Sequence, residues 1–576
     1  MAVAVHARRD EAGLQELAGG RGAPAAWLAR IGLVSVTLAA GYQLVCSFQS
    51  MVFLNQHALV MDDAYYYFQI ARNVALHGRV TFDGLHATSG IQLLWAGILS
   101  LVALVFSGRI EFLRATLVLS TVLNVLAGVL LWRLGRKLYS AVVGNIAALL
   151  WSGLMFALWP TLLGMEYSLH IVIIIATIST WWDVLAAGKA VAPGRLLLLG
   201  SLLTLNYWNR LDSALLSVLI ASSVGVALWP ARSERRAYLG RMTALAVVPA
   251  VGAIAYGAAN LFLTGTLIPL SGMVKGYYAA QHFDAYNWFT SLAGHVLWWV
   301  KIQGRAPLDV VASVWSRDSW FRPLPAAVLA LVLLLTVSGA RQIYGERTTN
   351  PQRYRMAQLL GLLWVFNALH TAFVVISIGH FSHVTRHYYA WLYITWCLWG
   401  ALLIPTLLSR LGSAKSRRLM VSLGLAVFVV MQGNAAIGRF VRPSTPVFDA
   451  RRVRLVAWLD RNLPADARIG AWNAGVLGYF SKHTVVNLDG LANDRDFFRL
   501  LQSGAPITDY LRREQITYVV DINDRDLTMP YHASWDRSRL FRNAIPWSEL
   551  QTSYVEPAQS MPVLVLRLKD TAAGNR

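Results

Sequence analysis

Residues 31–49, which read IGLVSVTLAAGYQLVCSFQ, contain no charged side chain. As an α-helix this stretch would rise about 28 Å, close to the roughly 30 Å hydrocarbon core of a bilayer. Similar runs lie at residues 115–132 and 242–263. Of the 576 residues, 56% are hydrophobic and 14% are charged, whereas about 25% are charged in a typical soluble domain. The sequence therefore predicts a polytopic α-helical membrane protein.

Basic residues are concentrated in the connectors between the apolar runs. The chain has 51 Lys and Arg against 30 Asp and Glu, a net charge of +21. Basic connectors of this kind are retained in the cytoplasm by the positive-inside rule. The positive charge therefore indicates membrane orientation and gives no reason to expect nucleic-acid binding. The five connectors lie at residues 133–137, 189–195, 232–241, 341–355 and 410–418.

Alternation of these connectors predicts the topology. The N-terminal arm, residues 1–30, is basic and is expected in the cytoplasm. Residues 91–106 would rise only about 24 Å as a helix, and a crossing there would place all five basic connectors outside. We therefore expect an interfacial helix at 91–106. About eleven crossings of the inner (cytoplasmic) membrane follow, with the N-terminus inside and the C-terminus outside.

The composition changes near residue 440. Residues 31–439 are expected to form a multi-span membrane domain with an external loop at 50–114, whereas residues 440–576 are richer in charge. A length of about 135 residues suits a single small domain. We expect an extracytoplasmic α/β domain with a helix at 450–462 and strands at 467–472, 484–488, 517–521 and 563–568.

The two cysteines, Cys46 and Cys397, lie in apolar runs far apart in the sequence. We expect them to pack as small hydrophobic side chains, not to form a disulfide or a metal site. No glycine-rich phosphate-binding or dinucleotide-binding motif occurs in a supporting strand–helix context. ATP hydrolysis and dinucleotide chemistry therefore do not fit this sequence.

Two adjacent carboxylates, Asp62 and Asp63, follow the first span in the segment MDDAYYYFQIARN, residues 61–73. The pattern predicts an aromatic-rich amphipathic helix that begins at these residues. Successive helix positions are about 100° apart, so the two side chains cannot point the same way. One can face a site while the other caps the helix or holds its neighbour. The alternative is that Asp62 is only the helix N-cap.

Further acidic and basic residues are predicted on the same side of the membrane. Glu166 ends an apolar segment, where an acidic side chain usually faces a cavity or a partner, although it could also lie at the water interface. Arg210 and Asp212 lie between two short apolar runs. They could serve a site, or they could neutralise each other in a tight connector.

Two cations, Lys275 and Arg386, are also predicted on the external side, the latter close to Tyr388. A phosphate at a membrane interface requires such charges, although either residue could instead be an interfacial anchor. Three histidines, His380, His383 and His387, are spaced for one helix face. They have no acidic companion nearby, so metal binding is the less favoured interpretation.

Several of these motifs resemble the GT-C superfamily of membrane glycosyltransferases. The resemblance includes bacterial members that use polyprenyl-phosphate sugars, with arabinofuranosyltransferase-like and mannosyltransferase-like relatives. Leu211 stands where relatives often have proline, and Ile268-Pro269-Leu270 where they often have Leu-Pro-Asn. The matching segments, in chain order, are DDAYYY (62–67), TSGIQLLW (88–95), GME (164–166), RLD (210–212), GVLGYFS (475–481) and VNLDGL (486–491).

The resemblance implies a GT-C-like fold with a lipid-linked sugar donor and an external-loop aspartate that serves as base or metal ligand. We expect Asp62 to be the principal base. Asp63 and Glu166 would orient it, bind the acceptor, or hold a divalent cation such as Mg²⁺ or Mn²⁺. Donor phosphate is expected at Lys275, Arg386, Arg210 and Tyr388, and acceptor or loop contacts at Tyr66, His86 and Gln92.

The predicted activity is transfer of a sugar from a polyprenyl-phosphate donor to an envelope glycan, glycolipid or protein on the non-cytoplasmic face. A transporter or flippase of lipid-linked glycans is the first alternative, but it should carry polar residues near the bilayer midplane and inverted repeats. A non-catalytic envelope assembly factor is the second. The sugar, the acceptor, the stereochemical outcome and the oligomeric state cannot be assigned from sequence.

Overall fold

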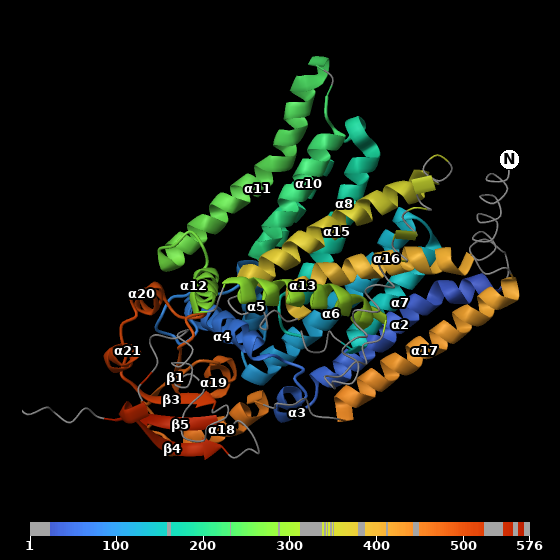
Figure 1. The fold of residues 1–576 in the computed structure, drawn as a ribbon. Helices are drawn as coiled ribbons and strands as arrows, with labels where there is room; N and C mark the ends of the chain where they lie inside the picture. Colours follow the sequence, from blue (N-terminus) through green and yellow to red (C-terminus); the bar gives the residue numbers. More distant parts are fainter. Residues whose placement is uncertain are drawn as a thin grey trace, which may run out of the picture.

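Long apolar helices make up most of the chain in the computed structural model (Figure 1). The structure describes residues 23–157, 163–230, 232–285, 288–311, 351–377, 386–409, 413–441, 448–522, 545, 547–556 and 563–569, and isolated positions between 334 and 348. The first 22 residues of the predicted cytoplasmic arm therefore lie outside the described part.

The helical domain is a bundle of helices with further short elements at its two ends. The long helices are α2 (Ala23–Ser47), α6 (Arg109–Leu138), α7 (Ala141–Ala157), α8 (Tyr167–Ala187), α9 (Pro193–Asn209), α10 (Ala214–Ala227), α11 (Arg235–Thr264), α13 (Trp288–Val311), α15 (Pro351–Ser377), α16 (Ala390–Ser409) and α17 (Ala414–Val441). The other elements of this domain are α3 (Met51–Gln56), α4 (Asp62–His77), α5 (Leu93–Val105), α12 (Leu270–Ala285), η2 (Gly188–Ala190), η3 (Leu211–Ser213), η4 (Arg232–Glu234) and η7 (Arg386–Tyr389).

Several helices have the length and surface of membrane spans. Among the described residues, five helices are long and apolar enough to cross a bilayer, and five shorter apolar helices accompany them. Helix α11 leaves large apolar side chains uncovered, including Ile254 at 73% and Phe262 at 90% exposure. Extended apolar surface of this kind suits contact with lipid better than contact with water. The chain is therefore a multi-pass membrane protein, while the count of about eleven crossings stays a prediction.

Helix α5 covers the segment that was predicted to lie at the interface. Its 13 residues rise about 20 Å, which is less than the hydrocarbon thickness. It packs against α4, α6 and α9. This short length agrees with an interfacial position, but the position relative to lipid stays a prediction.

Ion pairs bring three of the basic connectors to one end of the bundle. Lys137 at the end of α6 and Arg195 at the start of α9 both contact Asp183 of α8, at 2.6 Å and 3.2 Å. Lys189, beyond α8, pairs with Glu234 before α11 at 2.5 Å. These helix ends therefore share one face of the protein, as the alternation of basic connectors requires.

The C-terminal domain is a mixed sheet with helices on both faces. Its strands are β1 (Arg468–Ala471), β2 (Thr484–Asn487), β3 (Ile516–Ile522), β4 (Leu550–Glu556) and β5 (Val563–Leu568). The strand order is β2-β1-β3-β5-β4; β1 is parallel to β2 and β3, and β5 is antiparallel to β3 and β4. The helices are α18 (Phe448–Asn462), α19 (Gly475–Phe480), α20 (Arg495–Ser503) and α21 (Ile507–Arg513), and the short η9 (Trp547–Glu549) precedes β4.

Side chains alternate between the two faces of this sheet. Along β5, Val563 and Val565 pack in one apolar cluster, whereas Leu564 and Leu566 pack in another. The predicted helix and all four predicted strands are confirmed. Strand β4 was not predicted, because it is an edge strand whose central residues are mostly exposed and polar.

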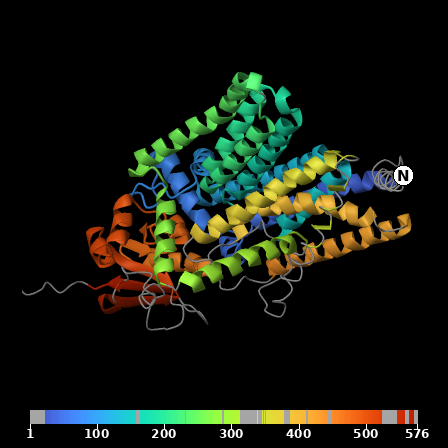
Figure 2. The ribbon, with the colours of Figure 1, turned by 45° about the horizontal axis from the view of Figure 1, so that its top comes forward.

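The C-terminal domain contacts the ends of the long helices that are opposite to the basic connectors (Figures 1 and 2). Arg109 at the start of α6 donates to the Phe480 carbonyl at 2.8 Å. Arg495 of α20 donates to the Gly265 carbonyl, just beyond α11, at 2.9 Å. The long helices thus separate the C-terminal domain from the basic connectors.

We predict that the two ends of the bundle face opposite sides of the membrane. Arg133→Cys is exposed beside a basic connector, and Asp509→Cys is exposed on the C-terminal domain; both native cysteines are buried. A membrane-impermeant maleimide should label Asp509→Cys in intact spheroplasts and Arg133→Cys only after lysis. Equal labelling of both before lysis would contradict the predicted topology.

Candidate functional site

The two adjacent aspartates begin α4, as expected, but neither caps that helix. The N-cap of α4 is Met61, which makes no side-chain capping bond. Residues four apart lie on one face of a helix, so Asp62 shares a face with Tyr66, and Asp63 shares a face with Tyr67. These two faces of α4 contact different parts of the molecule.

The face with Asp62 and Tyr66 contacts the C-terminal domain. Asp62 accepts hydrogen bonds from the backbone N–H groups of Val476, at 2.8 Å, and Gly475, at 3.3 Å, where α19 begins. The Tyr66 hydroxyl accepts from the Ala474 N–H at 2.8 Å. Both side chains therefore join two domains. Asp62 acts as a helix cap, but for α19 and not for its own helix.

The face with Asp63 and Tyr67 is turned toward the helical domain. Asp63 is accessible to solvent, although protein surrounds it on most sides, and the resulting loss of hydration, with the negative charge of Asp62, raises its pKa to about 6. Lys275 acts against this shift, and Glu166 adds to it. A carboxylate with this pKa is ionised at neutral pH and can accept a proton.

Lys275 of α12 is the cation that influences Asp63. Its Nζ donates to the Tyr388 hydroxyl at 3.3 Å and lies 5.6 Å from the centre of the Tyr388 ring. The same ring lies 5.5 Å from the guanidinium carbon of Arg210. Tyr388 therefore separates two cations near Asp63. The structure thus brings Lys275, Tyr388, Arg210 and Asp63 into one region, although they are far apart in sequence.

Arg210 is the centre of a buried ion-pair network. Its Nη1 donates to Glu166 Oε1 at 2.8 Å and to the Tyr167 hydroxyl at 2.6 Å. Its Nε and Nη2 donate to the two oxygens of Asp212, at 3.2 Å and 2.8 Å. The Nε2 atom of His370, on α15, lies 3.1 Å from Asp212. Glu166 and Asp212 thus share one guanidinium, and His370 contacts Asp212.

This network changes two sequence-based expectations. Four of the five guanidinium N–H groups of Arg210 are already used, so Arg210 has little capacity left for a donor phosphate. Glu166 is 2% exposed and paired, so it is not a free base. The pairing of Arg210 with Asp212, which was the alternative interpretation of that motif, is confirmed, but it includes Glu166 as well.

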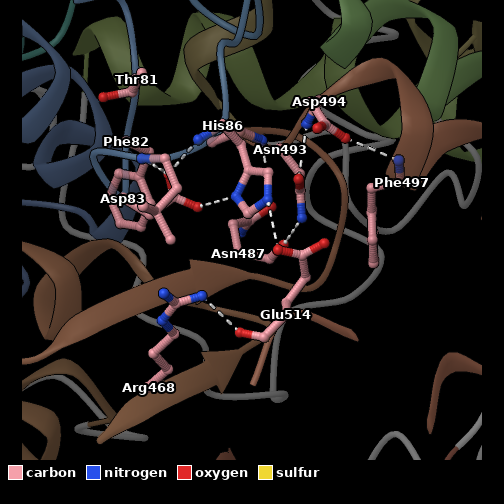
Figure 3. A network of polar contacts seen from close by, with 12 residues as sticks. Thr81, Phe82, Asp83, His86, Arg468, Asn487, Asn493, Asp494, Phe497 and Glu514 are labelled. Carbon is pink, nitrogen blue, oxygen red and sulfur yellow. Dashed lines mark hydrogen bonds and ion pairs between the residues drawn. The ribbon is translucent and has the colours of Figure 1, made fainter. Parts of the chain in front are cut away.

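Two of the three residues expected at the acceptor or loop, His86 and Tyr66, make side-chain contacts within the protein. His86 pairs with Asp83 at 2.6 Å and with Glu514 of the C-terminal domain at 3.3 Å (Figure 3). Burial opposes its protonation, but the hydrogen bond and charge of Asp83 prevail and raise the pKa of His86 to about 9. Tyr66 is buried at the domain contact. The backbone of Gln92 is hydrogen-bonded to the Tyr67 hydroxyl, which also lies against Glu166.

Asp489 is a further carboxylate in this region, and sequence reasoning did not single it out. It follows β2, and its Oδ1 accepts from the Leu491 N–H at 2.8 Å. Burial raises its pKa to about 7 against the hydrogen bonds from Leu491 and Asn487, and the charges of Asp63 and Asp62 add to the rise. The C-terminal domain therefore brings a carboxylate within electrostatic range of Asp63. The VNLDGL motif contained this residue, but no spacing rule connected it to residues 62–63.

Other expected residues lie outside the described part of the chain. His380 and His383 are not described, nor are the side chains of Arg386 and His387. Within the described residues, no group of three or more His, Cys, Asp or Glu side chains is placed to hold a metal ion. Asp62 is engaged by N–H groups and Glu166 by Arg210, so Asp62, Asp63 and Glu166 together do not fit the ligand set of Mg²⁺ or Mn²⁺.

Comparison with known proteins places the fold. Residues 444–560 match a family described as a domain of unknown function (DUF8728). No curated protein matches the sequence significantly. The apo oligosaccharyltransferase of Archaeoglobus fulgidus is similar in structure, with a TM-score of 0.51 and 11% identity, over 89% of this chain and 71% of that chain.

Two further solved structures are similar at lower scores. One is the archaeal oligosaccharyltransferase AglB from Archaeoglobus fulgidus in complex with an inhibitory peptide and a dolichol-phosphate. Its TM-score is 0.47 at 12% identity, over 85% of this chain and 69% of that chain. The other is ArnT from Cupriavidus metallidurans in the apo state, with a TM-score of 0.46 at 11% identity, over 92% of this chain and 97% of that chain. Of these three structures, the apo oligosaccharyltransferase, with a TM-score above 0.5, places the fold, and a fold of this kind agrees with the resemblance of the sequence motifs.

We predict that removing the Arg210 guanidinium destabilises the protein strongly. Arg210→Met leaves Glu166 and Asp212 buried without their cation, which typically costs about 3–5 kcal/mol. The matched control is Arg195→Met in the first turn of α9. The Arg195–Asp183 pair is partly exposed, at 49% and 27%, and should be worth roughly 0–1 kcal/mol. Fluorescence melting in detergent should show a large fall in Tm for the first variant alone; similar Tm values for both would contradict the assignment.

Proposed function

We propose that the protein is a GT-C glycosyltransferase that moves a sugar from a polyprenyl-phosphate donor to an acceptor on the non-cytoplasmic face of the inner membrane. The observation that carries the proposal is the placement of Asp63. It is an accessible carboxylate with a raised pKa, beside a cation and opposite the basic end of the bundle. An envelope glycan, glycolipid or protein would supply the acceptor hydroxyl.

The proposed reaction needs one proton acceptor and one site for an anionic leaving group. The acceptor oxygen attacks the anomeric carbon, its proton passes to Asp63, and the bond from that carbon to the phosphate oxygen breaks. Polyprenyl phosphate leaves with the electron pair. General-base assistance of this kind typically contributes about 10²–10⁴ in rate. No step in this scheme runs through a metal ion.

Asp63 replaces Asp62 as the proposed base. Asp62 was expected to be the principal base, but its two oxygens accept hydrogen bonds from α19. These contacts direct the Asp62 carboxylate at the C-terminal domain and away from the face of α4 that carries Asp63. Asp63 has no such backbone contact among those described, and its pKa of about 6 suits a base that operates near neutral pH.

Lys275 is the proposed phosphate ligand. It is half-buried and contacts Tyr388, so the cation lies in a partly dehydrated position, where a charge-assisted contact to phosphate is strong. Arg386 precedes Tyr388 by two residues and stays a candidate for the same role. Stabilisation of the leaving phosphate would then act where negative charge develops in the transition state.

We expect Asp63→Asn to abolish most transfer activity while the protein folds and binds donor. Asparagine is nearly isosteric but cannot accept the proton, so kcat should fall about 10²–10⁴-fold. In the wild type, kcat should be lost as the pH falls through about 6, because Asp63 becomes protonated there. Purified protein in nanodiscs, supplied with a panel of polyprenyl-phosphate pentoses and hexoses, allows both measurements by mass spectrometry of the products.

The matched control is Asp62→Asn. Its amide keeps one acceptor oxygen for the start of α19 and gives up the other, so its activity should fall less than that of Asp63→Asn, which loses the base itself. Full activity of Asp63→Asn would exclude Asp63 as the base. Intact lipid-linked sugar moved across the bilayer without bond cleavage would instead support the transporter alternative.

We expect Lys275→Ala to weaken use of the donor while stability changes little. Without the cation, kcat/KM for the polyprenyl-phosphate sugar should fall at least tenfold, because a charge-assisted phosphate contact is lost. Lys301→Ala is the control: Lys301 is an exposed cation that lies 4.1 Å from the Trp298 ring on α13. If both variants keep wild-type kinetics, Lys275 is an interfacial anchor and not a phosphate ligand.

A further inference from the structure

The Tyr66 hydroxyl connects α4 to three separate groups of the C-terminal domain. It donates to the Trp472 carbonyl at 3.3 Å, and it accepts from the Ala474 N–H at 2.8 Å and from Asn487 Nδ2 at 2.9 Å. Asn487 in turn donates to the Trp472 carbonyl at 3.3 Å. One side chain of α4 therefore joins the end of β1, the start of α19 and the end of β2.

Asp62 adds a second connection one helical turn away. It accepts from Gly475 and Val476, and the contact is so close that a Cβ on Gly475 would lie 2.2 Å from the Asp62 carbonyl oxygen. Only glycine permits this approach of α19 to α4. Asp62 and Tyr66 thus fix one face of α4 at two points along its axis.

Fixing this face also fixes the direction of Asp63. The side chains of a helix end about 5–6 Å from its axis, so a rotation of about 10° moves a carboxylate on the order of 1 Å. A displacement of that size can reduce the rate of a reaction about 10²-fold. Asp63, which follows Asp62 directly, therefore depends on the contact that Asp62 and Tyr66 make.

We infer that the C-terminal domain is a clamp that fixes the orientation of α4 about its own axis and so directs Asp63 at the reacting groups. The clamp consists of Tyr66 and Asp62 with their partners Trp472, Ala474, Gly475, Val476 and Asn487. In this inference Tyr66 is a positioning residue. The inference rests on the proposed role of Asp63 as base, and it gives the domain of unknown function a part in the reaction.

Tyr65 and Phe68 of α4 also pack against the Tyr479 ring of α19, but two polar contacts of the domain lie away from α4. Tyr277 of α12 donates to the Leu501 carbonyl at 2.8 Å, and His86 reaches Glu514 from the loop after α4. These contacts attach the domain at positions that do not touch α4. They allow the effect of losing the clamp to be separated from the effect of weakening the attachment of the domain.

The test is Tyr66→Phe, which removes one oxygen and keeps the ring. The clamp predicts that kcat falls about 10–100-fold while KM for the polyprenyl-phosphate sugar stays within about twofold, because Asp63 is misdirected and the phosphate site is intact. Tyr277→Phe is the matched control, since it also removes a tyrosine hydroxyl that donates to this domain. It should keep kcat within about twofold of the wild type.

A second pair of variants tests the same contact from the other side. Gly475→Ala places a methyl group against Asp62 and should reproduce the fall in kcat. Gly97→Ala on α5 is its control, because an added Cβ there meets nothing within 4 Å. Equal loss of kcat in all four variants, or wild-type kcat in Tyr66→Phe and Gly475→Ala, would overturn the clamp.

Hydrogen exchange gives a readout that does not depend on activity. Amides of residues 62–77 should exchange faster in Tyr66→Phe and Gly475→Ala than in the wild type, and they should be unchanged in the two controls. Unchanged exchange in both clamp variants would overturn the inference even if Asp63→Asn is inactive. Faster exchange together with full activity of Asp63→Asn would instead keep the clamp and reject Asp63 as the base.

Discussion

The candidate site depends on the packing of α4 between two domains. Neighbouring side chains of a helix point about 100° apart, so the adjacent carboxylates of α4 must enter different surroundings. Asp62 meets the backbone N–H groups at the start of α19, whereas Asp63 faces Lys275 and remains accessible. One helix therefore supplies a structural carboxylate and a chemically available one from consecutive residues.

Charge balance explains which polar residues are available for chemistry. A buried charge must be paired, because an uncompensated one is strongly destabilising. Arg210 is therefore held by Glu166 and Asp212, and these three residues stabilise the fold around the site. Asp63 and Lys275 are less enclosed, so they can exchange partners with a substrate. The distinction follows from burial, not from residue type.

Much of the fold could be predicted from the sequence. The apolar runs marked the long helices, and the basic connectors marked one end of them. Residues 563–568, VLVLRL, form a nearly continuous apolar run, as a strand covered on both faces does. Strand β4 lacked such a signal, because an edge strand has no need of apolar residues on its open side. The pairing of Glu166 with Arg210 could not be predicted, because it joins residues 44 positions apart and needs the packing of α8 against α9.

The choice between Asp62 and Asp63 could not be made from the sequence either, because it also depends on a contact between residues far apart in the chain. Both belong to one motif, and local geometry requires only that they point in different directions. What separates them is Gly475, more than 400 positions away, where the missing side chain lets α19 approach Asp62. Asp489 enters the region from the same domain. The composition changes clearly near residue 440, where the helical domain gives way to the α/β domain. The site extends across this boundary, because the residues that orient and surround Asp63 come from both domains.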